Sequence, residues 1–316
     1  MKIIGLQDSL PSSEKSVVTV GNFDGVHRGH TFLIRQITRL AQEKGLRSVV
    51  VTFDPHTRSV VYPELYQMIL TTFEEKASLI SDLGVDYLLR IPFNEEFRGL
   101  SAEQFLERIL INKLHVSDWM MGEGHSVGKD RAGGKKFLHS VTGKYHINVF
   151  TADLDTESET VISSTQIRKL IVEGRIADAV AMLGHPYLIS AERTEGMKIG
   201  TRLGYPTLNF KKPSSQKVIP PAGVYAAELE LRGRRVQGAL YFGDCPTYSK
   251  RDIHFEFHAF NLDNQDPAVG ETVHIWLHRH IRADVAFSEE CELVDQITQD
   301  INEIRNFFSQ ETQKWL

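Results

Sequence analysis

The chain has 316 residues, more than one hydrophobic core usually supports, and this length predicts two domains. Hydrophobic residues make up 41% and charged residues 24%, values typical of an ordinary globular protein. The net charge of -5, from 36 Lys and Arg against 41 Asp and Glu, gives no broad basic surface and argues against nucleic acid as a partner. No apolar run has membrane-spanning length and residues 1–10 lack a signal-peptide core, so we expect no membrane partner and a cytoplasmic location.

Residues 16–53 predict a strand, a tight loop, a helix and a second strand. Ser16–Val20 is an apolar, β-branched run, and after His27 apolar residues recur at helical spacing as far as Gly45. Residues 46–53 then return as a second apolar strand, so the unit is βαβ and a right-handed crossover is expected. The loop between strand and helix contains the strand-breaking residues Gly21, Asn22, Asp24 and Gly25.

His27 and His30 lie where this helix begins. In an open parallel sheet, ligands bind beyond the carboxyl ends of the strands, and the free N–H groups at a helix N-terminus favour an anion there. The two histidines can converge on one phosphate, and Gly29 between them lets the backbone approach it. The alternative is a pair of surface or capping histidines, which their position between a strand and a helix disfavours.

The end of the second strand lies on the same edge of the predicted sheet. Asp54 or His56 could contact a ligand there, but Asp-Pro is also a common turn, and both interpretations have equal weight. Further along, residues 72–75 and 101–104 have the sequence of helix capping boxes, and residues 85–93 are typical of a strand. This alternation of helix and strand predicts an α/β first half.

Residues 115–134 predict a strand that leads into a glycine-rich loop. The loop carries Lys129 and Arg131, which could offer positive charge to the phosphates of a nucleotide. A solvated loop without a ligand has the same composition. The spacing of the residues therefore leaves both interpretations open.

A second candidate phosphate site lies in residues 161–173. Ser164 and Thr165 crowd the start of a predicted helix whose first turns carry Arg168. Hydroxyl groups, free N–H groups and a guanidinium together can bind phosphate. A plain serine cap with a solvated basic face is the alternative, and it stays open.

After Gly184 the sequence pattern changes from helices to short strands separated by turn residues such as Arg232-Gly233 and Asp263-Asn264. Even spacing of this kind predicts a small antiparallel barrel, and a helix over residues 288–308 is predicted at the end of the chain. We therefore place the domain boundary between residues 184 and 185. Strands are predicted in YLISAERTEG, GVYAAELEL, RRVQGALYFG, HFEFHAFNL and ETVHIWLHRHI.

Two features of this second half could carry chemistry. Thr207 and Asn209 lie two residues apart, so in an extended segment both side chains point to one face and could hold a metal-bound nucleotide phosphate. Glu256 alternates with Phe255 and Phe257 in the predicted strand, so it points away from both. By pattern alone a solvent-facing carboxylate is favoured over a general base.

Taken together, these motifs resemble the bacterial bifunctional riboflavin kinase/FMN adenylyltransferases, also called FAD synthetases. The resemblance extends over the whole chain. It is carried by GNFDGVHRGH, TFDPHT, LTTFEEK, GKDRAGG and ISSTQIR in the first half and by GTRLGYPTLN, GVYAAELEL, CPTY and FEFHAF in the second.

The resemblance implies a Rossmann-like nucleotidyltransferase domain over residues 1–184, which adenylylates FMN to FAD with release of pyrophosphate. His27 and His30 would bind ATP phosphates and stabilise the leaving pyrophosphate, and Arg168 would hold the triphosphate from the other side. The residues expected to bind the nucleotide in this domain are Gly21, Asn22, Phe23, Asp24, Gly29, Asp54, Ser164 and Thr165.

For residues 185–316 the resemblance implies a riboflavin kinase barrel of six strands, and both reactions are expected to use ATP and Mg²⁺. Thr207 and Asn209 would bind the metal and ATP together with Gly200 and Gly204, and Glu256 would take the proton from the attacking ribityl hydroxyl. The implied small molecules are riboflavin, ATP, the intermediate FMN and the product FAD. A monomer or weak homo-oligomer is expected.

The chain departs from the family pattern mainly in the first half. Residues 122–128 read GEGHSVG where the family usually has GYDFRFG, which removes aromatic packing groups. Gly134 replaces the usual Asp after RAG, Glu195-Gly196 replaces the common His-Gly, and Leu208 replaces the usual Ala. An alternative function is therefore a riboflavin kinase whose first domain is a regulatory nucleotide- or flavin-binding module.

Overall fold

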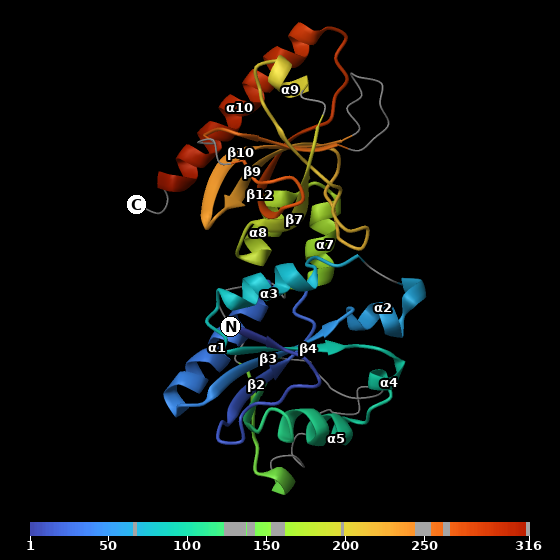
Figure 1. Ribbon diagram of the computed structural model, residues 1–316, viewed down its shortest axis with the longest axis vertical. Coiled ribbons are helices and arrows are strands. Elements are labelled where there is room, and N and C mark those ends of the chain that lie inside the picture. Colours follow the sequence, from blue (N-terminus) through green and yellow to red (C-terminus); the bar gives the residue numbers. More distant parts are fainter. Residues whose placement is uncertain are drawn as a thin grey trace. The chain divides into compact units, whose positions relative to one another are not determined.

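The computed structural model in Figure 1 describes the helices and strands in two compact units. The described residues are 1–65, 68–122, 137, 143–152, 162–196, 199–243, 254–261 and 266–313. The units comprise Met1–Ser163 and Ser164–Leu316, and each is described by itself. The domain boundary between residues 184 and 185 stays a prediction, because packing contacts assign helices to a unit without assigning an activity to it.

The first unit is built on a six-stranded parallel sheet in the order β1-β4-β3-β2-β5-β6. The chain passes from β2 to β3 and β4 in one direction and then returns to place β5 on the other side of β2. Ligands of open α/β sheets bind at such a switch point. The strands are β1 (Lys2–Ile4), β2 (Ser16–Val20), β3 (Arg47–Asp54), β4 (Tyr87–Pro92), β5 (Val116–Met121) and β6 (Asn148–Thr151).

Helices cover both faces of this sheet, and Figure 1 shows α3 and α5 on opposite sides of it. Both predicted capping boxes are confirmed: Thr72 and Glu75 cap α3, and Ser101 and Gln104 cap α5. The helix predicted from residue 101 continues as a π-helical stretch, Leu106–Ile111. The helices are α1 (Arg28–Lys44), α2 (Thr57–Val61), α3 (Phe73–Ser81), α4 (Glu95–Arg98) and α5 (Ala102–Phe105), with a 3₁₀ turn at Pro63–Leu65.

Aliphatic side chains of the central strands form the core of the first unit. Every residue of β2 is buried, and residues 48–52 of β3 are buried as well. Strands that are covered on both faces have continuous apolar runs of this kind. The predicted α/β class of this half is confirmed, with α1 following β2 and ending at Gly45 in the left-handed conformation.

The second unit begins with two helices and contains a closed six-stranded barrel in the order β10-β11-β8-β7-β12-β9. All its strand pairs are antiparallel, as predicted. Arg232 and Gly233 both have positive φ, as a type I′ hairpin turn requires, whereas the predicted turn at residues 263–264 lies outside the described residues. The elements are α7 (Ser164–Val172), α8 (Ile176–Leu183), β7 (Tyr187–Thr194), α9 (Ile199–Arg202), β8 (Leu208–Phe210), β9 (Gly223–Leu231), β10 (Arg234–Gly243), β11 (His254–Ala259), β12 (Thr272–Ala283) and α10 (Glu290–Gln313).

Helix α10 runs along the outside of the barrel (Figure 1). Its residues Ile304 and Phe308 are buried with Val224 and Ala226 of β9. The Arg282 guanidinium on β12 donates two hydrogen bonds to the Asp300 carboxylate on α10. Apolar burial and this ion pair together fix the helix on the barrel.

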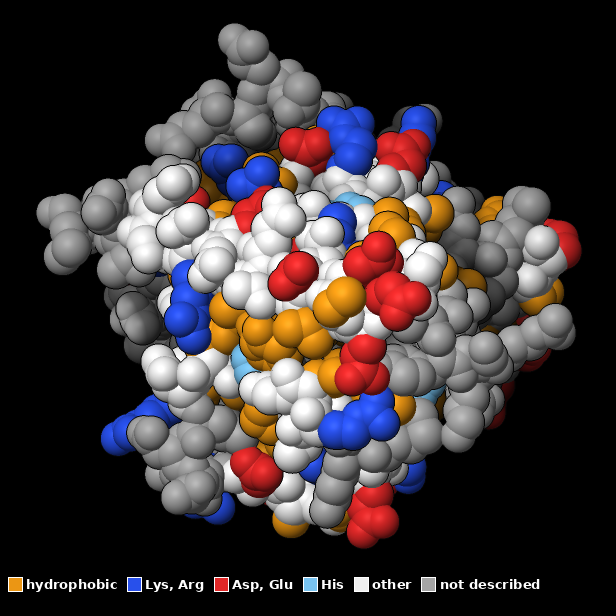
Figure 2. Space-filling model, turned by 90° about the horizontal axis from the view of Figure 1, so that it is seen from above, with side chains coloured by type: hydrophobic (Ala, Val, Ile, Leu, Met, Phe, Trp, Pro, Cys, Tyr) orange, Lys and Arg blue, Asp and Glu red, His pale blue; other side chains and the backbone are white. Residues whose placement is uncertain are grey.

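In the part of the chain that the structure describes, no helix has the length and apolar character needed to cross a membrane. Acidic and basic side chains are interspersed on the face that Figure 2 draws in colour. This mixture agrees with the nearly balanced charge of the sequence.

Candidate active sites

The first candidate site is the loop between β2 and α1, which lies beside the switch point of the parallel sheet. Phe23, Gly25 and Val26 in this loop have φ of 48°, 83° and 39°. Positive φ is strained for a phenylalanine or a valine, and it persists only where the surroundings hold the backbone. This loop delivers His27 to the N-cap position of α1.

The structure brings His27 and His30 together, as their spacing predicts. Their rings stack with centroids 3.6 Å apart and an interplanar angle of 19°, and the Phe23 and His30 rings make a T-shaped contact. A Cβ on Gly29 would lie 3.4 Å from the His27 ring, which is ordinary van der Waals contact. Two adjacent imidazoles at a helix N-terminus can donate hydrogen bonds to one phosphate.

Other predicted ligand residues hold the loop in place. The buried Asp24 carboxylate accepts hydrogen bonds from the backbone N–H groups of Leu70 and Thr71. The Asn22 side chain donates to Thr57 Oγ1 at 2.9 Å and accepts from the Thr57 N–H at 3.2 Å. In this structure both side chains therefore shape the site, and a contact with nucleotide stays a prediction for each.

At the end of β3, the Asp54 carboxylate forms an ion pair with Arg90 of β4. The Arg90 guanidinium lies 4.1 Å above the Phe73 ring. His56 is the N-cap of α2, and its imidazole Nδ1 accepts a hydrogen bond from the Arg58 N–H. This side chain therefore stabilises the start of α2. Asp54 thus contributes to a charged rim beside the loop of the two histidines.

Lys76 is a candidate that the sequence reasoning missed. Its ammonium donates to the Asn22 carbonyl and to Thr52 Oγ1, both at 2.9 Å. Burial lowers the pKa of Lys76 to about 8, against the opposing effects of Asp24 and Asp54. A signal was present, because Lys76 follows Phe73 by three residues and so lies on the buried face of α3.

The predicted phosphate-binding residues Ser164, Thr165 and Arg168 all lie in α7, the first helix of the second unit. The hydroxyl residues occupy the first turn, where backbone N–H groups lack helical partners. Binding of one nucleotide by these residues and the two histidines stays a prediction. The predicted glycine-rich loop with Lys129, Arg131 and most of GEGHSVG lies outside the described residues.

The second candidate site lies on the barrel, where β8 pairs with β11. Asn209 is the antiparallel partner of Glu256, and Thr207 Oγ1 donates to Glu256 Oε2 at 2.8 Å. Phe255 and Phe257 are buried, and the half-buried Glu256 points to the opposite face, as the alternation predicts. Residues separated by 49 positions therefore form one cluster of oxygen ligands.

Glycines bring α9 and the preceding segment close to this cluster. A Cβ on Gly196 would lie 2.2 Å from the Asn209 amide nitrogen. A Cβ on Gly200 would lie 2.3 Å from the Tyr205 carbonyl oxygen and 3.3 Å from Thr207. Gly204 has a φ of 89° and makes the turn that follows α9. A larger residue at 200 would therefore collide with backbone, whereas one at 196 would displace the Asn209 side chain.

The donor set of this cluster fits Mg²⁺. Mg²⁺ takes oxygen ligands and usually binds through one or two protein groups together with substrate phosphates. Thr207 and Asn209 offer a hydroxyl and an amide oxygen, and Glu256 offers a carboxylate. Among the described residues, no group of three or more His, Cys, Asp and Glu could hold a metal by itself. Mg²⁺ bound to Thr207, Asn209 and Glu256 would take further oxygen ligands from the phosphates of ATP.

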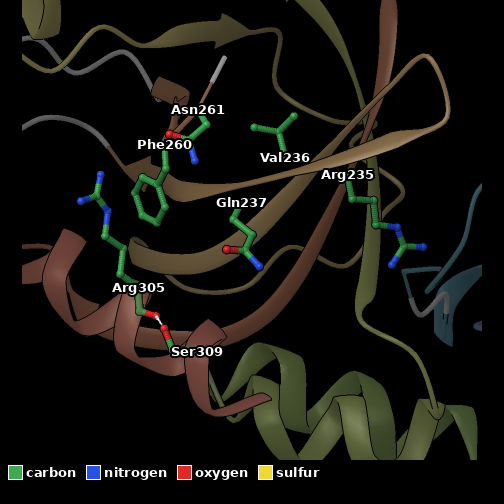
Figure 3. Close-up of a pocket in the computed structure, with 7 residues that line it drawn as sticks. All are labelled: Arg235, Val236, Gln237, Phe260, Asn261, Arg305 and Ser309. Atoms are coloured by element: carbon green, nitrogen blue, oxygen red, sulfur yellow. Dashed lines mark hydrogen bonds between the residues drawn. The ribbon is translucent and has the colours of Figure 1, made fainter. Parts of the chain in front are cut away.

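A separate cavity of about 530 Å³ lies between β10, the end of β11 and α10. Figure 3 shows Gln237 and Phe260 on its barrel side and Arg305 and Ser309 on α10, while Arg235 points away from Phe260. Arg305 lies 5.0 Å from the Phe260 ring centroid. None of the predicted site residues lines this cavity.

Comparison with known proteins finds two family models that match this chain, and each matched range contains one of the two candidate sites. The FAD synthetase model matches residues 9–166, and the riboflavin kinase model matches residues 183–308. Curated proteins named bifunctional riboflavin kinase/FMN adenylyltransferase match almost the full chain. The relative from Buchnera aphidicola is 33% identical and covers 98% of this chain and 99% of that protein. The chain belongs to the bifunctional riboflavin kinase/FMN adenylyltransferase family.

Other members of the family are similarly close. The riboflavin kinase/FMN adenylyltransferase of Listeria monocytogenes is 32% identical over 98% of this chain and 99% of that protein. The Escherichia coli K12 member is 31% identical over 98% of each. The resemblance seen in the sequence motifs is thus confirmed, and this chain is an enzyme with both domains of the family.

A solved structure supports the fold of this riboflavin kinase/FMN adenylyltransferase family member. A crystal structure of a protein from Streptococcus pneumoniae, named there a macrolide-efflux protein, superposes with a TM-score of 0.81. The two sequences are 25% identical, and the match covers 96% of this chain and 99% of that chain. The efflux name applies to the streptococcal protein alone, and the shared architecture is what the superposition adds here.

Proposed function

We propose that this chain phosphorylates riboflavin to FMN with ATP and then adenylylates FMN to FAD, with release of pyrophosphate. The supporting observation is that each half holds an assembled cluster of the expected chemistry. His27 and His30 are stacked at the switch point of the first unit. Thr207, Asn209 and Glu256 meet across β8 and β11 of the second.

In the adenylyl transfer, a phosphate oxygen of FMN attacks the α-phosphorus of ATP, and the bond to the bridging oxygen of pyrophosphate breaks. His27 and His30 donate hydrogen bonds to the phosphate oxygens and stabilise charge on the leaving group. Ser164, Thr165 and Arg168 bind the triphosphate. No covalent intermediate is needed, since positioning and electrostatic stabilisation supply most of the catalysis in such reactions.

In the kinase reaction, the ribityl hydroxyl of riboflavin attacks the γ-phosphorus of ATP, and the bond from that phosphorus to the bridging oxygen of the β-phosphate breaks, so that ADP leaves and FMN forms. Glu256 accepts the hydroxyl proton, and the hydrogen bond from Thr207 orients its carboxylate. Thr207 and Asn209 hold the ATP phosphates and would ligate Mg²⁺, with Gly200 and Gly204 shaping the backbone around them. When bound, Mg²⁺ neutralises charge on the transferring phosphate.

The alternative, a riboflavin kinase whose first domain only binds a nucleotide or flavin, is not favoured. Both domain models match, and the full-length relatives carry both activities in their names. A pure binding module also has less need of two imidazoles at the position of a leaving pyrophosphate. Substitution of the aromatic GYDFRFG by GEGHSVG is then a tolerated variation.

A chromatographic assay tests the proposal. Purified protein is incubated with riboflavin, ATP and Mg²⁺, and FMN and FAD are quantified separately over time. We expect FMN to appear first and FAD to follow, with release of pyrophosphate. Accumulation of FMN without FAD, even when FMN is supplied at high concentration, would overturn the adenylyltransferase half of the proposal.

A further inference from the structure

A charged side chain lies inside the first unit directly behind the loop of the two histidines. Lys76 belongs to the buried face of α3, with Phe73, Ala77 and Ile80, and it is 5% exposed. Lysine at such a position is unusual, since burial of an ammonium is unfavourable unless it is fully hydrogen-bonded. Its contacts therefore point to a specific role.

The hydrogen bonds of Lys76 connect the ends of two neighbouring strands. Its Nζ donates to the Asn22 carbonyl after β2, to Thr52 Oγ1 in β3, and at 3.4 Å to the Phe53 carbonyl. Thr52 Oγ1 also donates to the Asn22 carbonyl at 3.1 Å, which closes a triangle. An ammonium has three donors, and three acceptors surround it here.

The Asn22 carbonyl belongs to the strained loop that leads to His27. In a trans peptide the C=O and N–H groups point in opposite directions, so the Phe23 N–H points away from Lys76. On the next residue, Asp24 is fixed by the backbone of Leu70 and Thr71. The residues on either side of Phe23 are therefore both fixed, Asn22 by the Lys76 ammonium and Asp24 by its carboxylate. These contacts hold Phe23 at its positive φ.

We propose that Lys76 is a positioning residue for adenylyl transfer: its protonated side chain fixes the Asn22 carbonyl and thereby holds His27 and His30 in their stacked arrangement. Lys76 acts through the loop and not on the substrate. The inference rests on the proposed adenylyltransferase activity of this unit. The kinase residues lie on the barrel of the second unit, so the kinase reaction should not depend on Lys76.

The charge on the Lys76 side chain depends on pH. The charged groups that face the ammonium are Asp24 in the loop after β2, Asp54 at the end of β3 and Arg90 on β4. Burial is the largest influence, and it brings the pKa of Lys76 down to about 8. Above that pH the neutral amine has two donors for three acceptors, and its bond to the Asn22 carbonyl loses its ionic component.

The first part of the test is the pH profile of the unmodified protein. The kcat of FAD formation from FMN and ATP is expected to fall as pH rises from about 7 to about 9.5, with a midpoint near the lowered pKa of Lys76. The kcat of FMN formation, measured on the same protein, is expected to lack this decline. Equal profiles for the two reactions would overturn the inference.

The second part uses three variants. Lys76→Met keeps the length of the side chain and removes its donors, so the kcat of FAD formation at about pH 7 should fall about tenfold or more and become independent of pH. Lys76→Arg stays charged over this pH range. Whatever the kcat of FAD formation is at about pH 7, it should therefore not fall as the pH rises. Lys113→Met is the matched control, because Lys113 also donates to a backbone carbonyl of this unit, that of Asp8.

The outcomes separate the inference from the proposed function. Failure of the unmodified protein to form any FAD contradicts the adenylyltransferase activity itself. Normal FAD formation by the unmodified protein together with an unchanged alkaline decline in Lys76→Met or Lys76→Arg contradicts the role of Lys76. An equal loss of kcat for FAD formation in Lys113→Met and Lys76→Met also contradicts the role of Lys76. Removal of any lysine that donates to a backbone carbonyl in this unit would then have the same effect.

Discussion

The imidazoles of His27 and His30 stack face to face, with ring centroids 3.6 Å apart, at the N-terminus of α1. One ring comes from the cap of the helix and the other from its first turn. Both therefore lie beside backbone N–H groups that have no helical acceptor. An anion at this point is favoured by the helix dipole and by both imidazoles.

His30→Ala should strongly reduce FAD formation and leave FMN formation intact. Loss of one positioned hydrogen-bond donor to a transition state typically reduces kcat by about 10²–10³-fold. The two products are separated by chromatography after incubation with riboflavin and ATP. The kinase reaction serves as the internal control, and a parallel loss of FMN formation would indicate a folding defect instead.

Glu256→Gln should have the converse effect. The amide keeps the size of the side chain and cannot accept the hydroxyl proton, so the kcat of riboflavin phosphorylation should fall by about 10²–10⁴-fold. FAD formation from supplied FMN should continue. Glu192→Gln on β7 is the control, because the Glu192 carboxylate forms an exposed ion pair with Lys211 and lies outside the cluster of Thr207, Asn209 and Glu256. Retention of wild-type kinase kcat in Glu256→Gln would rule out the general base.

Gly200→Ala should impair the kinase through the backbone. The added Cβ would lie 2.3 Å from the Tyr205 carbonyl oxygen, so α9 must move away from Thr207. We expect the KM for ATP in riboflavin phosphorylation to rise about tenfold, equivalent to about 1.4 kcal/mol. Gly143→Ala is the control, since among the described residues no atom beyond its own chain neighbours lies within 4 Å of its Cβ position. Unchanged steady-state kinetics in Gly200→Ala would exclude this close approach.

Asp300→Asn should destabilise the second unit. Arg282 and Asp300 are 20% and 6% exposed, and the substitution leaves the largely buried Arg282 guanidinium without its charged partner. We expect the free energy of unfolding in urea to fall by about 3 kcal/mol. Asp178→Asn, which breaks the exposed pair with Arg175, should change it by less than about 1 kcal/mol. Equal effects of the two substitutions would contradict the burial argument.

Lys76 should make the stability of the protein depend on pH. Its pKa is about 8 in the folded chain and 10.5 in an exposed lysine, so the unfolded chain binds more protons between these values. The free energy of unfolding should therefore rise with pH across this window, by on the order of 3 kcal/mol for this group. Urea unfolding at about pH 7 and about pH 9.5 measures the rise. Lys76→Met should show a smaller rise than the unmodified protein.

Local sequence patterns were sufficient for the elements that carry the first site. Ser16–Val20 forms β2, the capping boxes begin α3 and α5, and Gly45 ends α1. Each depends on interactions within a few residues, such as hydrogen bonds in the first turn of a helix. By contrast, β1 and β6 were not predicted. They are short and partly exposed, and they form only because β4 and β5 offer free edges.

The sequence by itself determined the two folds, the order of the motifs and the face on which Glu256 lies, because alternation and helical spacing are properties of the local backbone. Only the tertiary structure decided which side chains meet. Thr207 bonds to Glu256 through the pairing of β8 with β11, and Lys76 reaches Asn22 across 54 residues. Such partners are fixed by how strands and helices pack, and the energy of burial that selects the packing is shared by the whole core.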